Sequence, residues 1–429
     1  MYKFSHLDRH LRDYFILYIF GAYLILSAFL FDTPVNIIKG MKVILFSPSN
    51  LTTDYIEIAG LGVAIFNSGI MTVLSIFLAQ KSKSIINGPL IAGVFIVSGF
   101  SFFGKNILNS IPITIGVFLY AKSLKTSFKN YILPALFGSC LGPLVSEIAF
   151  GMGFSLFKGL VIGYLAGIFV GYIIPPLAQS FLRFHQGFSL YNVGFTAGII
   201  GMFITATLKM FDINIETVEF ISKGNNLQLS LILYLLSIAM IVGGVLSSTN
   251  IIVEYRELLK NTGQLVADFY DLYGLPITLV NMGVMGILST SFILIIGGQL
   301  SGPVVGGVLT VIGFSAFGKH PRNTLPILFG ARLAAILNIY DENGASSLMV
   351  MLFGTNLAPI AGKYGFIPGA IAGFVHVALV SNIAYLHGGL NLYNNGFAGG
   401  FVAGTVVPLY EAIKSAYRAY RRRKNSSVR

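Results

Sequence analysis

Two lysines in strongly apolar surroundings are the residues of this sequence that are best placed to do chemistry. Lys105 and Lys319 each end the motif Gly-Phe-Ser-x-Phe-Gly-Lys, and the two copies lie 214 residues apart. An ammonium group flanked by glycine, amide and hydroxyl groups can bind an anion or a polar solute in a cavity of low dielectric constant. The alternative is a lysine that extends from a loop toward the membrane surface. The first interpretation makes both lysines candidate residues of a solute pathway.

A second polar motif, Asn-Ser/Thr-x-Pro, begins four residues after each lysine. A capping side chain followed by proline in the first turn is typical of a helix N-terminus. The exposed N–H groups of such an end attract anionic or carbonyl groups, although helix capping alone also explains the motif. The pathway candidates from this motif are Asn109, Ser110, Asn323 and Thr324.

Four more asparagines lie inside apolar segments, and each stands two residues before a glycine. An amide inside a membrane span either joins two helices by a hydrogen bond or lines a pathway. These candidates are Asn67, Asn281, Asn192 and Asn394. Tyr191 and Tyr393, which precede the last two, fit an aromatic belt at the membrane surface.

Two carboxylate pairs also recur at the spacing of 214 residues. Paired carboxylates could coordinate a cation or carry a proton that drives transport. Acidic residues are also favoured in the first turn of a helix, where the helix dipole stabilises them. The candidates for ion or proton coupling are Asp54, Glu57, Asp268 and Asp271.

The rest of the sequence carries no pattern that is typical of catalysis or metal binding. The six histidines show no metal-ligand spacing, and the single Cys140 excludes a multi-cysteine metal site. Nucleotide-binding loops and nucleophile–base motifs are absent as well. We therefore predict no enzyme activity, no cofactor and no metal site. A membrane-embedded enzyme, starting from Glu147 or from His320 with Arg322, and a scaffold protein are the alternatives from other functional classes.

The elements that position these residues must be helices in a lipid bilayer. Hydrophobic residues make up 55% of the chain and charged residues only 10%, and the mean hydropathy is +0.79. A soluble domain carries roughly 25% charged residues, so an ordinary soluble enzyme is excluded. Backbone groups in lipid must satisfy their own hydrogen bonds, which favours helices. We predict an all-α integral membrane protein in which short segments, such as 109–121 and 323–338, are re-entrant or broken.

An internal duplication organises the chain. Besides the lysine motif, Leu-Phe-Gly-x-x-Leu-x-Pro recurs at 136–143 and 352–359, and Leu-Tyr-Asn-x-Gly-Phe recurs at 190–195 and 392–397. Each half holds about seven hydrophobic segments. The predicted parts are an N-terminal membrane repeat at 1–210, a linker at 211–228, a C-terminal membrane repeat at 229–410 and a basic tail at 411–429.

The loop charges predict that the second repeat is inverted. Six basic residues lie in loops of the first half, and the equivalent loops of the second half contain no Lys or Arg. Because cytoplasmic loops are enriched in Lys and Arg, equivalent loops must lie on opposite sides of the membrane. The six are Lys81, Lys83, Lys122, Lys125, Lys129 and Arg183.

The same rule predicts a multi-pass protein of the cell membrane with both termini in the cytoplasm. The basic tail would then contact anionic lipid. Nucleic acid is not expected as a partner, because no basic patch with interleaved aromatic residues lies outside the tail. The sequence is also compatible with a homo-oligomer.

The repeated motifs also carry a resemblance. With its two copies of the lysine and Leu-Tyr-Asn motifs, the chain resembles a bacterial membrane family that has two homologous halves and no assigned activity. More distantly, Asn67 followed by the Gly-Phe-x-x-Phe-Gly motif is similar to urea transporters. That resemblance implies inverted halves, re-entrant half-helices and a pore lined by phenylalanine. The chain departs from it by lacking Asn-Pro-x-Ser-Gly and by carrying Lys105 and Lys319.

We therefore predict a membrane channel or permease for a small polar solute, with its pathway at the interface between the repeats. An ion-coupled secondary transporter is the nearest alternative, and the carboxylate pairs would then handle the ion.

Overall fold

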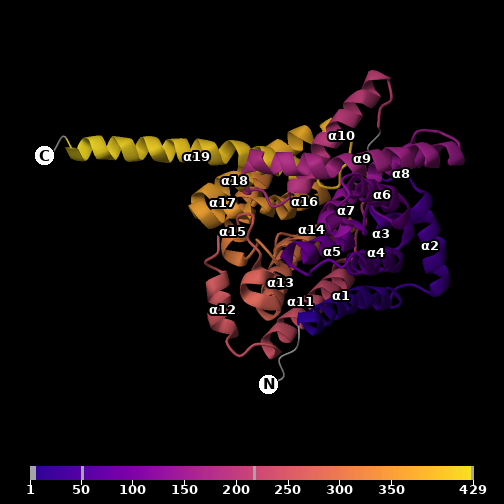
Figure 1. Ribbon diagram of the computed structural model, residues 1–429, viewed down its shortest axis with the longest axis horizontal. Coiled ribbons are helices and arrows are strands. Elements are labelled where there is room, and N and C mark those ends of the chain that lie inside the picture. The colour runs from indigo at the N-terminus through magenta and orange to yellow at the C-terminus, as the bar shows by residue number, and fades with distance from the viewer. Residues whose placement is uncertain (1–5, 50–52, 216–218, 338, 427–429) are drawn as a thin grey trace.

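Every regular element of the described chain is helical, as the computed structural model in Figure 1 shows. The structure describes residues 6–49, 53–215, 219–337 and 339–426. The first residues of the N-terminal repeat, the middle of the predicted linker and the last residues of the basic tail lie outside these ranges. The all-α prediction is confirmed.

The described residues contain ten helical segments that are long and apolar enough to cross a membrane. Three further apolar helices are shorter, with bounds Gly88–Phe100, Ile107–Ser123 and Gly302–Phe314. A full crossing needs about 20 residues, so the two helices of 13 residues, Gly88–Phe100 and Gly302–Phe314, are too short to cross alone. Ten apolar spans are the pattern of an integral membrane protein.

The first half consists of α-helices with two short 3₁₀ turns (η1 and η2) and one π-helical turn (η3). In chain order they are α1 His6–Ala28, α2 Pro34–Phe46, α3 Tyr55–Ala59, α4 Leu61–Lys81, α5 Gly88–Phe100, α6 Ile107–Ser123, η1 Phe128–Tyr131, α7 Ile132–Gly138, η2 Ser139–Leu141, α8 Gly142–Ser146, η3 Glu147–Gly151, α9 Leu156–His185 and α10 Asn192–Met210.

The second half repeats this order. Its elements are α11 Asn226–Leu246, α12 Ile251–Leu258, α13 Phe269–Ile295, α14 Gly302–Phe314, α15 Pro321–Leu337, α16 Ala345–Gly354, η4 Thr355–Leu357, α17 Ala358–Tyr364, α18 Phe366–Ile383, η5 Ala384–His387 and α19 Asn394–Ser426.

A glycine kink shows how closely the two halves match. Gly60 separates α3 from α4 with φ 107° and ψ 157°. Gly274 interrupts α13 at the equivalent position with φ 80° and ψ 168°. Positive φ at these angles is readily adopted only by glycine. The internal duplication is therefore a duplication of structure down to single backbone angles.

A second shared feature is a helix broken in its middle. The apolar stretch Phe128–Gly151 is interrupted by a 3₁₀ turn at Ser139–Leu141 before α8 begins. The stretch Ala345–Tyr364 is interrupted in the same way at Thr355–Leu357. A proline stands at the start of the helix after each break, where its missing N–H costs least. The breaks place polar side chains of the turns inside the protein.

The short helices α5 and α14 pack against each other in the centre of the molecule. Gly99, near the end of α5, lies against Gly306 near the start of α14, and an added Cβ would stand 2.8 Å from the Gly306 carbonyl oxygen. Gly313, near the end of α14, lies against Ala92 near the start of α5. The two helices therefore run antiparallel, and glycine permits their close approach.

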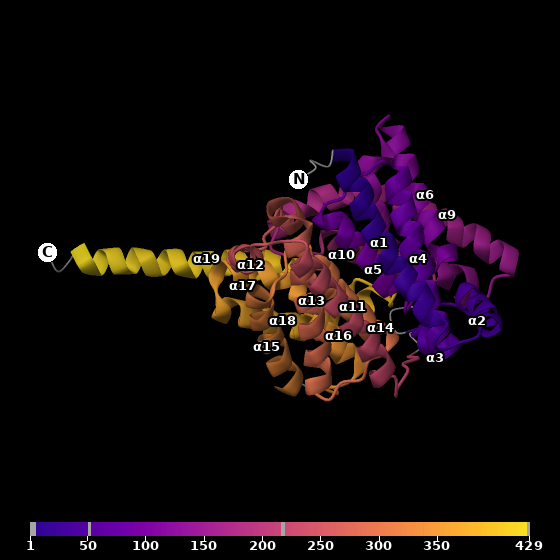
Figure 2. The same ribbon diagram turned by 90° about the horizontal axis from the view of Figure 1, so that it is seen from below.

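The outer elements are arranged at two ends of the molecule. Helix α2 lies at one end of the body and α12 at the opposite end in both Figure 1 and Figure 2. The last turns of α19 project beyond the body on the α12 side. These turns carry exposed basic side chains, among them Arg418, Arg421 and Arg422.

Candidate functional site

Lys319 lies fully buried where the two halves meet. Its ammonium group donates to the hydroxyl of Tyr191 at 2.7 Å and to Oγ1 of Thr355 at 2.7 Å. Tyr191 belongs to the first half and Thr355 to the broken helix of the second half. The ammonium also stands over the rings of Tyr191, at 4.7 Å, and Phe314, at 5.2 Å. Residues of both repeats thus hold this lysine.

Lys105 lies in the equivalent place of the first half and is 1% exposed. Its ammonium group donates to Oγ of Ser139, which corresponds to Thr355 in the second half. Each of these hydroxyls also donates to a backbone carbonyl three residues earlier, Leu136 or Leu352. The break in each membrane helix therefore supplies one hydroxyl acceptor to one lysine.

Aromatic rings from both halves pack together beside Lys319. Tyr191 and Tyr393 lie 5.1 Å apart between ring centroids, and they are 2% and 1% exposed. Phe100 packs against Tyr393 at 4.7 Å, and Phe314 packs against Tyr191 at 4.5 Å. Phe353 reaches both Phe100 and Tyr191. The two tyrosines therefore lie at the repeat interface and not in an aromatic belt at the membrane surface.

Reciprocal backbone bonds hold this interface together. Leu190 N donates to the carbonyl of Asn356 at 3.0 Å, and Leu392 N donates to the carbonyl of Cys140 at 3.1 Å. Each bond joins the segment before α10 or α19 to the broken helix of the other half. Such reciprocity is what a two-fold relation between equivalent surfaces produces.

We call the two lysines, the two tyrosines, Ser139 and Thr355 the lysine cluster. The ion pairs that are seen within the described ranges join Arg12 to Asp13, Lys260 to Glu257 and Arg332 to Glu342. None of them includes a residue of the cluster. The buried lysines are therefore held by hydroxyl groups and rings rather than by carboxylates.

Asn67 and Asn281 position the loops that carry the lysines. The amide nitrogen of Asn67 donates to the carbonyls of Ser101, at 2.7 Å, and Lys105, at 3.0 Å. Asn281 makes the equivalent two bonds in the second half, both at 2.7 Å. These amides bind the backbone of the loops that end in Lys105 and Lys319, and they make no contact with the ammonium groups themselves.

Asn109 and Asn323 cap the helices that follow the lysines. Asn109 forms a capping box with Asn106 at the start of α6. The side chain of Asn323 accepts from the backbone N–H of His320, and its amide nitrogen donates to the carbonyl of Gly318 at 2.9 Å. The hydroxyls of Ser110 and Thr324 donate to the adjacent asparagine oxygens. The structure thus places this group in helix capping beside the cluster.

Asn192 and Asn394 each pair with a histidine at the start of a long helix. Asn192 contacts Nε2 of His185 at 3.0 Å, and Asn394 contacts Nε2 of His387 at 2.7 Å. Asn192 also donates to the carbonyl of Ala178. These pairs anchor the start of α10 and α19, the helices that Tyr191 and Tyr393 directly precede.

The acidic residues that recur in both halves cap helices across the interface between the halves. Asp54 accepts from the N–H of Ile56 in α3, and also from the N–H of Gly302 at the start of α14, at 2.9 Å. Asp268 accepts from Asp271 N and, across the interface, from the N–H of Gly88 at the start of α5, at 3.0 Å. Each half thereby caps the short central helix of the other.

Burial changes the acidity of these two capping groups. Desolvation raises the pKa of Asp54 above its usual value although Ser222 and backbone N–H groups oppose the shift. Desolvation, assisted by the neighbouring Asp271, raises the pKa of Asp268 to about 6. Glu57 and Asp271 themselves are exposed. The carboxylate pairs therefore do not converge on one another, and one member of each pair faces outward.

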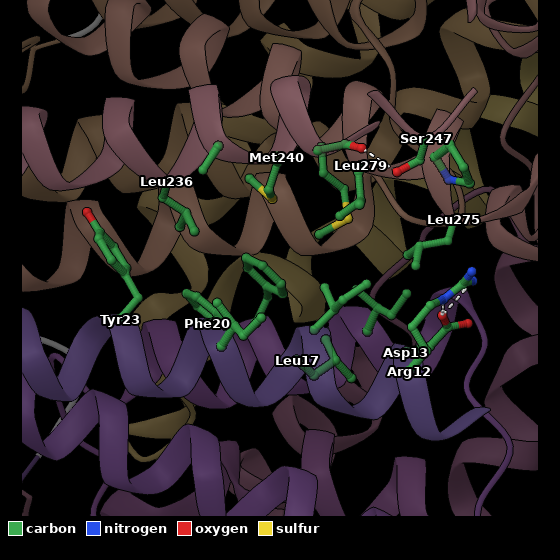
Figure 3. Close-up of a pocket in the computed structure, with 18 of the residues that line it drawn as sticks. Arg12, Asp13, Leu17, Phe20, Tyr23, Leu236, Met240, Ser247, Leu275 and Leu279 are labelled. Atoms are coloured by element: carbon green, nitrogen blue, oxygen red, sulfur yellow. Dashed lines mark hydrogen bonds and ion pairs between the residues drawn. The ribbon is translucent and has the colours of Figure 1, made fainter. Parts of the chain in front are cut away.

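Two cavities lie away from the lysine cluster. The first, of about 380 Å³, runs between α1 and the helices α11 and α13, and Figure 3 shows Leu17 and Phe20 facing Leu236 and Met240 across it. Its lining is mostly apolar, with Arg12, Asp13 and Ser247 at one end and Tyr23 at the other. The second, of about 660 Å³, opens among α16, α18 and the start of α19, where Asn394 contributes to the wall.

No group of three His, Cys, Asp or Glu side chains within the described ranges is placed to hold a metal ion. The sequence motifs identified the lysines and their supporting asparagines, but they missed Ser139, Thr355 and the role of the two tyrosines. A signal was available, because all four lie in the repeated blocks around Leu-Phe-Gly and Leu-Tyr-Asn.

Comparison with known proteins places the chain in a family but gives no activity. Residues 33–210 and 247–412 match a family described as "Protein of unknown function (DUF1576)", with one matched region in each half. No curated protein and no solved structure matches the chain. The matched regions cover most of the sequence, and the chain belongs to this family of unknown function, DUF1576.

Proposed function

We propose that this protein is an integral membrane channel or permease for a small polar solute, with its pathway at the interface between the two halves. The observation that carries the proposal is the lysine cluster, to which both repeats contribute equivalent buried lysines, hydroxyls and tyrosines. Burying two unpaired ammonium groups is costly in a protein interior. Ionisable groups at membrane depth that face the protein interior are typical of substrate pathways.

The proposal includes an inverted arrangement of the two repeats. The antiparallel packing of α5 and α14 supports it, because a two-fold axis that relates antiparallel helices runs perpendicular to them. The positions of α2 and α12 at opposite ends of the body support it as well (Figure 1). Helices that lie in the two membrane surfaces would be found in those positions. The six basic residues in the loops of the first half point the same way.

The orientation follows from the charges. With the basic loops in the cytoplasm, both termini are cytoplasmic, and the basic end of α19 contacts anionic lipid there. Inverted halves with short central helices are also the features that the chain shares with urea transporters, and that likeness stays a prediction. The lysines set the solute of this protein apart from that family.

The contacts of the acidic residues favour a channel or permease over an ion-coupled transporter. Asp54 and Asp268 each accept hydrogen bonds from backbone N–H groups of two helices. Because their oxygens are engaged in helix capping, they are poorly placed to bind and release a coupling ion. The alternative of a membrane enzyme is weaker for a similar reason, because Nε2 of His320 contacts the carbonyl of Asn261 at 2.8 Å and the residue lies at a helix start.

The test is solute flux into liposomes that contain the purified full chain, with a panel of small neutral, cationic and anionic solutes. Lys319→Met is expected to lower the flux of the transported solute at least about tenfold, the scale on which local charge changes association rates. Lys122→Met is the matched control, because that lysine is exposed at the end of α6. Absence of flux for every solute, with protein that is folded and inserted, would refute the proposal.

A further inference from the structure

We propose that the larger of the two cavities, among α16, α18 and the start of α19, binds a small zwitterion that carries an ammonium group and a carboxylate. The inference rests on the proposed function in one respect, because this zwitterion is then the solute that the protein transports. It is carried by unpaired amide donors deep in the cavity, by acidic and aromatic side chains in its outer part, and by a local departure from the duplication.

Two neighbouring asparagines form the deep wall of this cavity. Asn394 and Asn395 both line it, although they are only 3% and 4% exposed. Oδ1 of Asn394 contacts Nε2 of His387 at 2.7 Å, and Oδ1 of Asn395 contacts Nε2 of His376 at 3.0 Å. Neither side-chain nitrogen has a hydrogen-bond partner among the described residues. Since each of these nitrogens carries two N–H donors, both amides can still donate to a ligand in the cavity.

The equivalent place in the first half is closed by a hydrogen bond. Asn192, the counterpart of Asn394, donates its amide nitrogen to the carbonyl of Ala178 at 2.9 Å. The residue that corresponds to Ala178 at the same spacing in sequence is Val380, and Val380 lines the cavity. The second half therefore has an open, polar space where the first half has a bond between two elements.

The side chains beside this place also differ between the halves. Val193 and Ile174 stand at the first-half positions that correspond to Asn395 and His376. The hydrogen-bonded pair of Asn395 and His376 is thus a feature of the second half alone. Buried polar groups in place of apolar ones cost free energy, and departures from the best packing are expected at functional sites.

Exposed carboxylates and tyrosines line the outer part of the cavity. Glu219 and Asp341 are exposed, and neither joins an ion pair within the described ranges. Tyr340 and Tyr385 also line the cavity and are 48% and 67% exposed. The ammonium of Lys209 stands 5.9 Å from the ring centroid of Tyr385, so the two carboxylates outnumber it. Acidic groups and aromatic faces both attract an ammonium group.

The deep and outer parts of the cavity favour opposite charges. The amide donors need an acceptor, and a carboxylate supplies two oxygens and forms hydrogen bonds roughly twice as strong as neutral ones. The outer carboxylates repel a ligand that is only an anion, and a ligand that is only a cation leaves the buried donors unpaired. The volume of about 660 Å³ is that of a small-molecule site. A small molecule with both groups satisfies both parts.

The deep wall of the cavity adjoins the turn that holds Lys319. The backbone carbonyl of Asn395 accepts from Nδ2 of Asn356 at 3.2 Å. Asn356 follows Thr355, whose hydroxyl accepts from the ammonium of Lys319. A carboxylate bound at the deep wall is therefore on the side of the broken helix that contacts the lysine cluster. This adjacency connects the ligand of the cavity to the solute of the proposed pathway.

The test is isothermal titration calorimetry of the purified full chain in detergent with a panel of amino acids. Each amino acid is compared with the amine that lacks its carboxylate and with the acid that lacks its ammonium group. At least one amino acid is expected to bind, and both of its partner compounds should bind at least about tenfold more weakly, since each loses charged hydrogen bonds. Absence of binding for every amino acid, or equal binding of either partner compound, would overturn the inference.

Variants test whether the ligand occupies this cavity. Asn395→Val introduces the first-half residue and should weaken binding at least about tenfold. Glu219→Gln changes only an exposed side chain and should weaken binding about threefold. Asn382→Ala is the matched control, because Asn382 is exposed on α18 and bonds within its own helix. Size-exclusion profiles and thermal midpoints establish that each variant is folded. The same affinity in all three variants would place the ligand elsewhere and overturn the inference.

Flux measurements separate this inference from the proposed function. The amino acid that binds is expected to enter liposomes that contain the protein, and Asn395→Val should lower its flux. Flux of other solutes alone would overturn the zwitterion as the solute and leave transport standing. Binding without flux of any solute would overturn transport and leave the binding site standing.

Discussion

Lys105 and Lys319 occupy positions where we expect an apolar side chain to make the folded protein more stable. Each is buried in a cluster of hydroxyls and rings without a carboxylate partner. Replacing a buried charge by an apolar side chain of similar volume is often stabilising. A residue that lowers stability at an interface between repeats is typical of a functional site.

Lys319→Met is therefore expected to raise the thermal midpoint of the protein in detergent while it lowers flux. The gain in the free energy of unfolding should be about 1–4 kcal/mol, because the ammonium no longer has to be desolvated. Differential scanning calorimetry or a thermal unfolding assay measures it, with Lys122→Met as the exposed control. A midpoint well below that of the wild type would show that the lysine holds the fold together instead.

The amides behind the lysines should behave in the opposite way. Asn67→Ala and Asn281→Ala each remove two hydrogen bonds and leave buried carbonyls without donors. Each should lower the free energy of unfolding by about 1–3 kcal/mol. The two amide nitrogens make the same bonds, and Asn281 adds only a long contact from the Tyr255 hydroxyl at 3.5 Å, so the two losses should be similar. A neutral effect at one site would contradict the structural equivalence of the two lysine loops.

At this scale, the duplication made the lysines and their asparagines recognisable from sequence. The repeated motifs marked them, but motifs do not reveal which surface a side chain faces. Tyr191 and Tyr393 are the example, since their place at the repeat interface depends on the packing of α10 against α19, where Gly194 and Gly396 approach closely. That packing is tertiary and leaves no local pattern.

At the scale of elements, the two halves are joined by helix caps that cross between them. Asp54 caps α14 and Asp268 caps α5, so each central half-sized helix begins on a carboxylate from the other repeat. A carboxylate at a helix N-terminus satisfies free N–H groups and interacts favourably with the helix dipole. These caps fix the ends of the two helices that meet at the centre.

Asp54→Ala is therefore expected to lower the free energy of unfolding by about 1–2 kcal/mol, the range for loss of an N-cap. Glu57→Ala is the matched control, because Glu57 is exposed three residues further along. The comparison of thermal midpoints in one detergent measures both. Equal midpoints for the two variants would mean that the cap across the halves contributes nothing to stability.

Asp268 adds a dependence on pH. Burial raises its pKa to about 6 in the folded protein, against 3.8 for the free side chain. The folded state therefore binds the proton more tightly, and stability from this group is present at low pH and is lost as pH rises from about 4 to about 6. Asp268→Asn should lack this loss. Parallel pH profiles of the wild type and the variant would contradict the shift.

The membrane helices could be predicted from sequence because their apolar composition determines them. Long apolar segments predict helices in lipid, because the backbone has no other way to satisfy its bonds. The interruption at Ser139–Leu141 and the kink at Gly60 were not predicted. Glycine and proline are frequent in membrane helices, so their presence alone does not tell which of them breaks a helix.

At the scale of the whole molecule, the lysine cluster lies at the point where the halves exchange contacts. Each half donates a tyrosine segment to the broken helix of the other, through Leu190 and Leu392. For the proposed transport function, we expect these contacts between the halves to open when solute reaches the buried lysines.

The inverted arrangement gives a prediction about sidedness. Lys122→Cys and Asp341→Cys, each in a Cys140→Ser background, place exposed thiols in equivalent loops of the two halves. An impermeant thiol reagent added outside oriented vesicles should label only one of them, and reagent on the other side should label the second. Labelling of both from the same side would contradict inversion.

The duplication, the helical class and the membrane setting of the whole molecule could be predicted from sequence, because each depends on composition or on repeated motifs. The way in which side chains of both repeats hold Lys319 could not. It depends on contacts between residues more than one hundred positions apart, such as the bond from Lys319 to Tyr191.

The central claim is that solute passes through the lysine cluster, and modification of Cys140 tests it most directly. Liposomes that contain the protein are treated with a small thiol reagent. Flux is then measured while the modified fraction of Cys140 is followed by mass spectrometry, with Cys140→Ser as the insensitive control. We predict that flux falls in proportion to the modified fraction and that the Ser variant keeps its flux. Full modification of Cys140 with unchanged flux would contradict the claim.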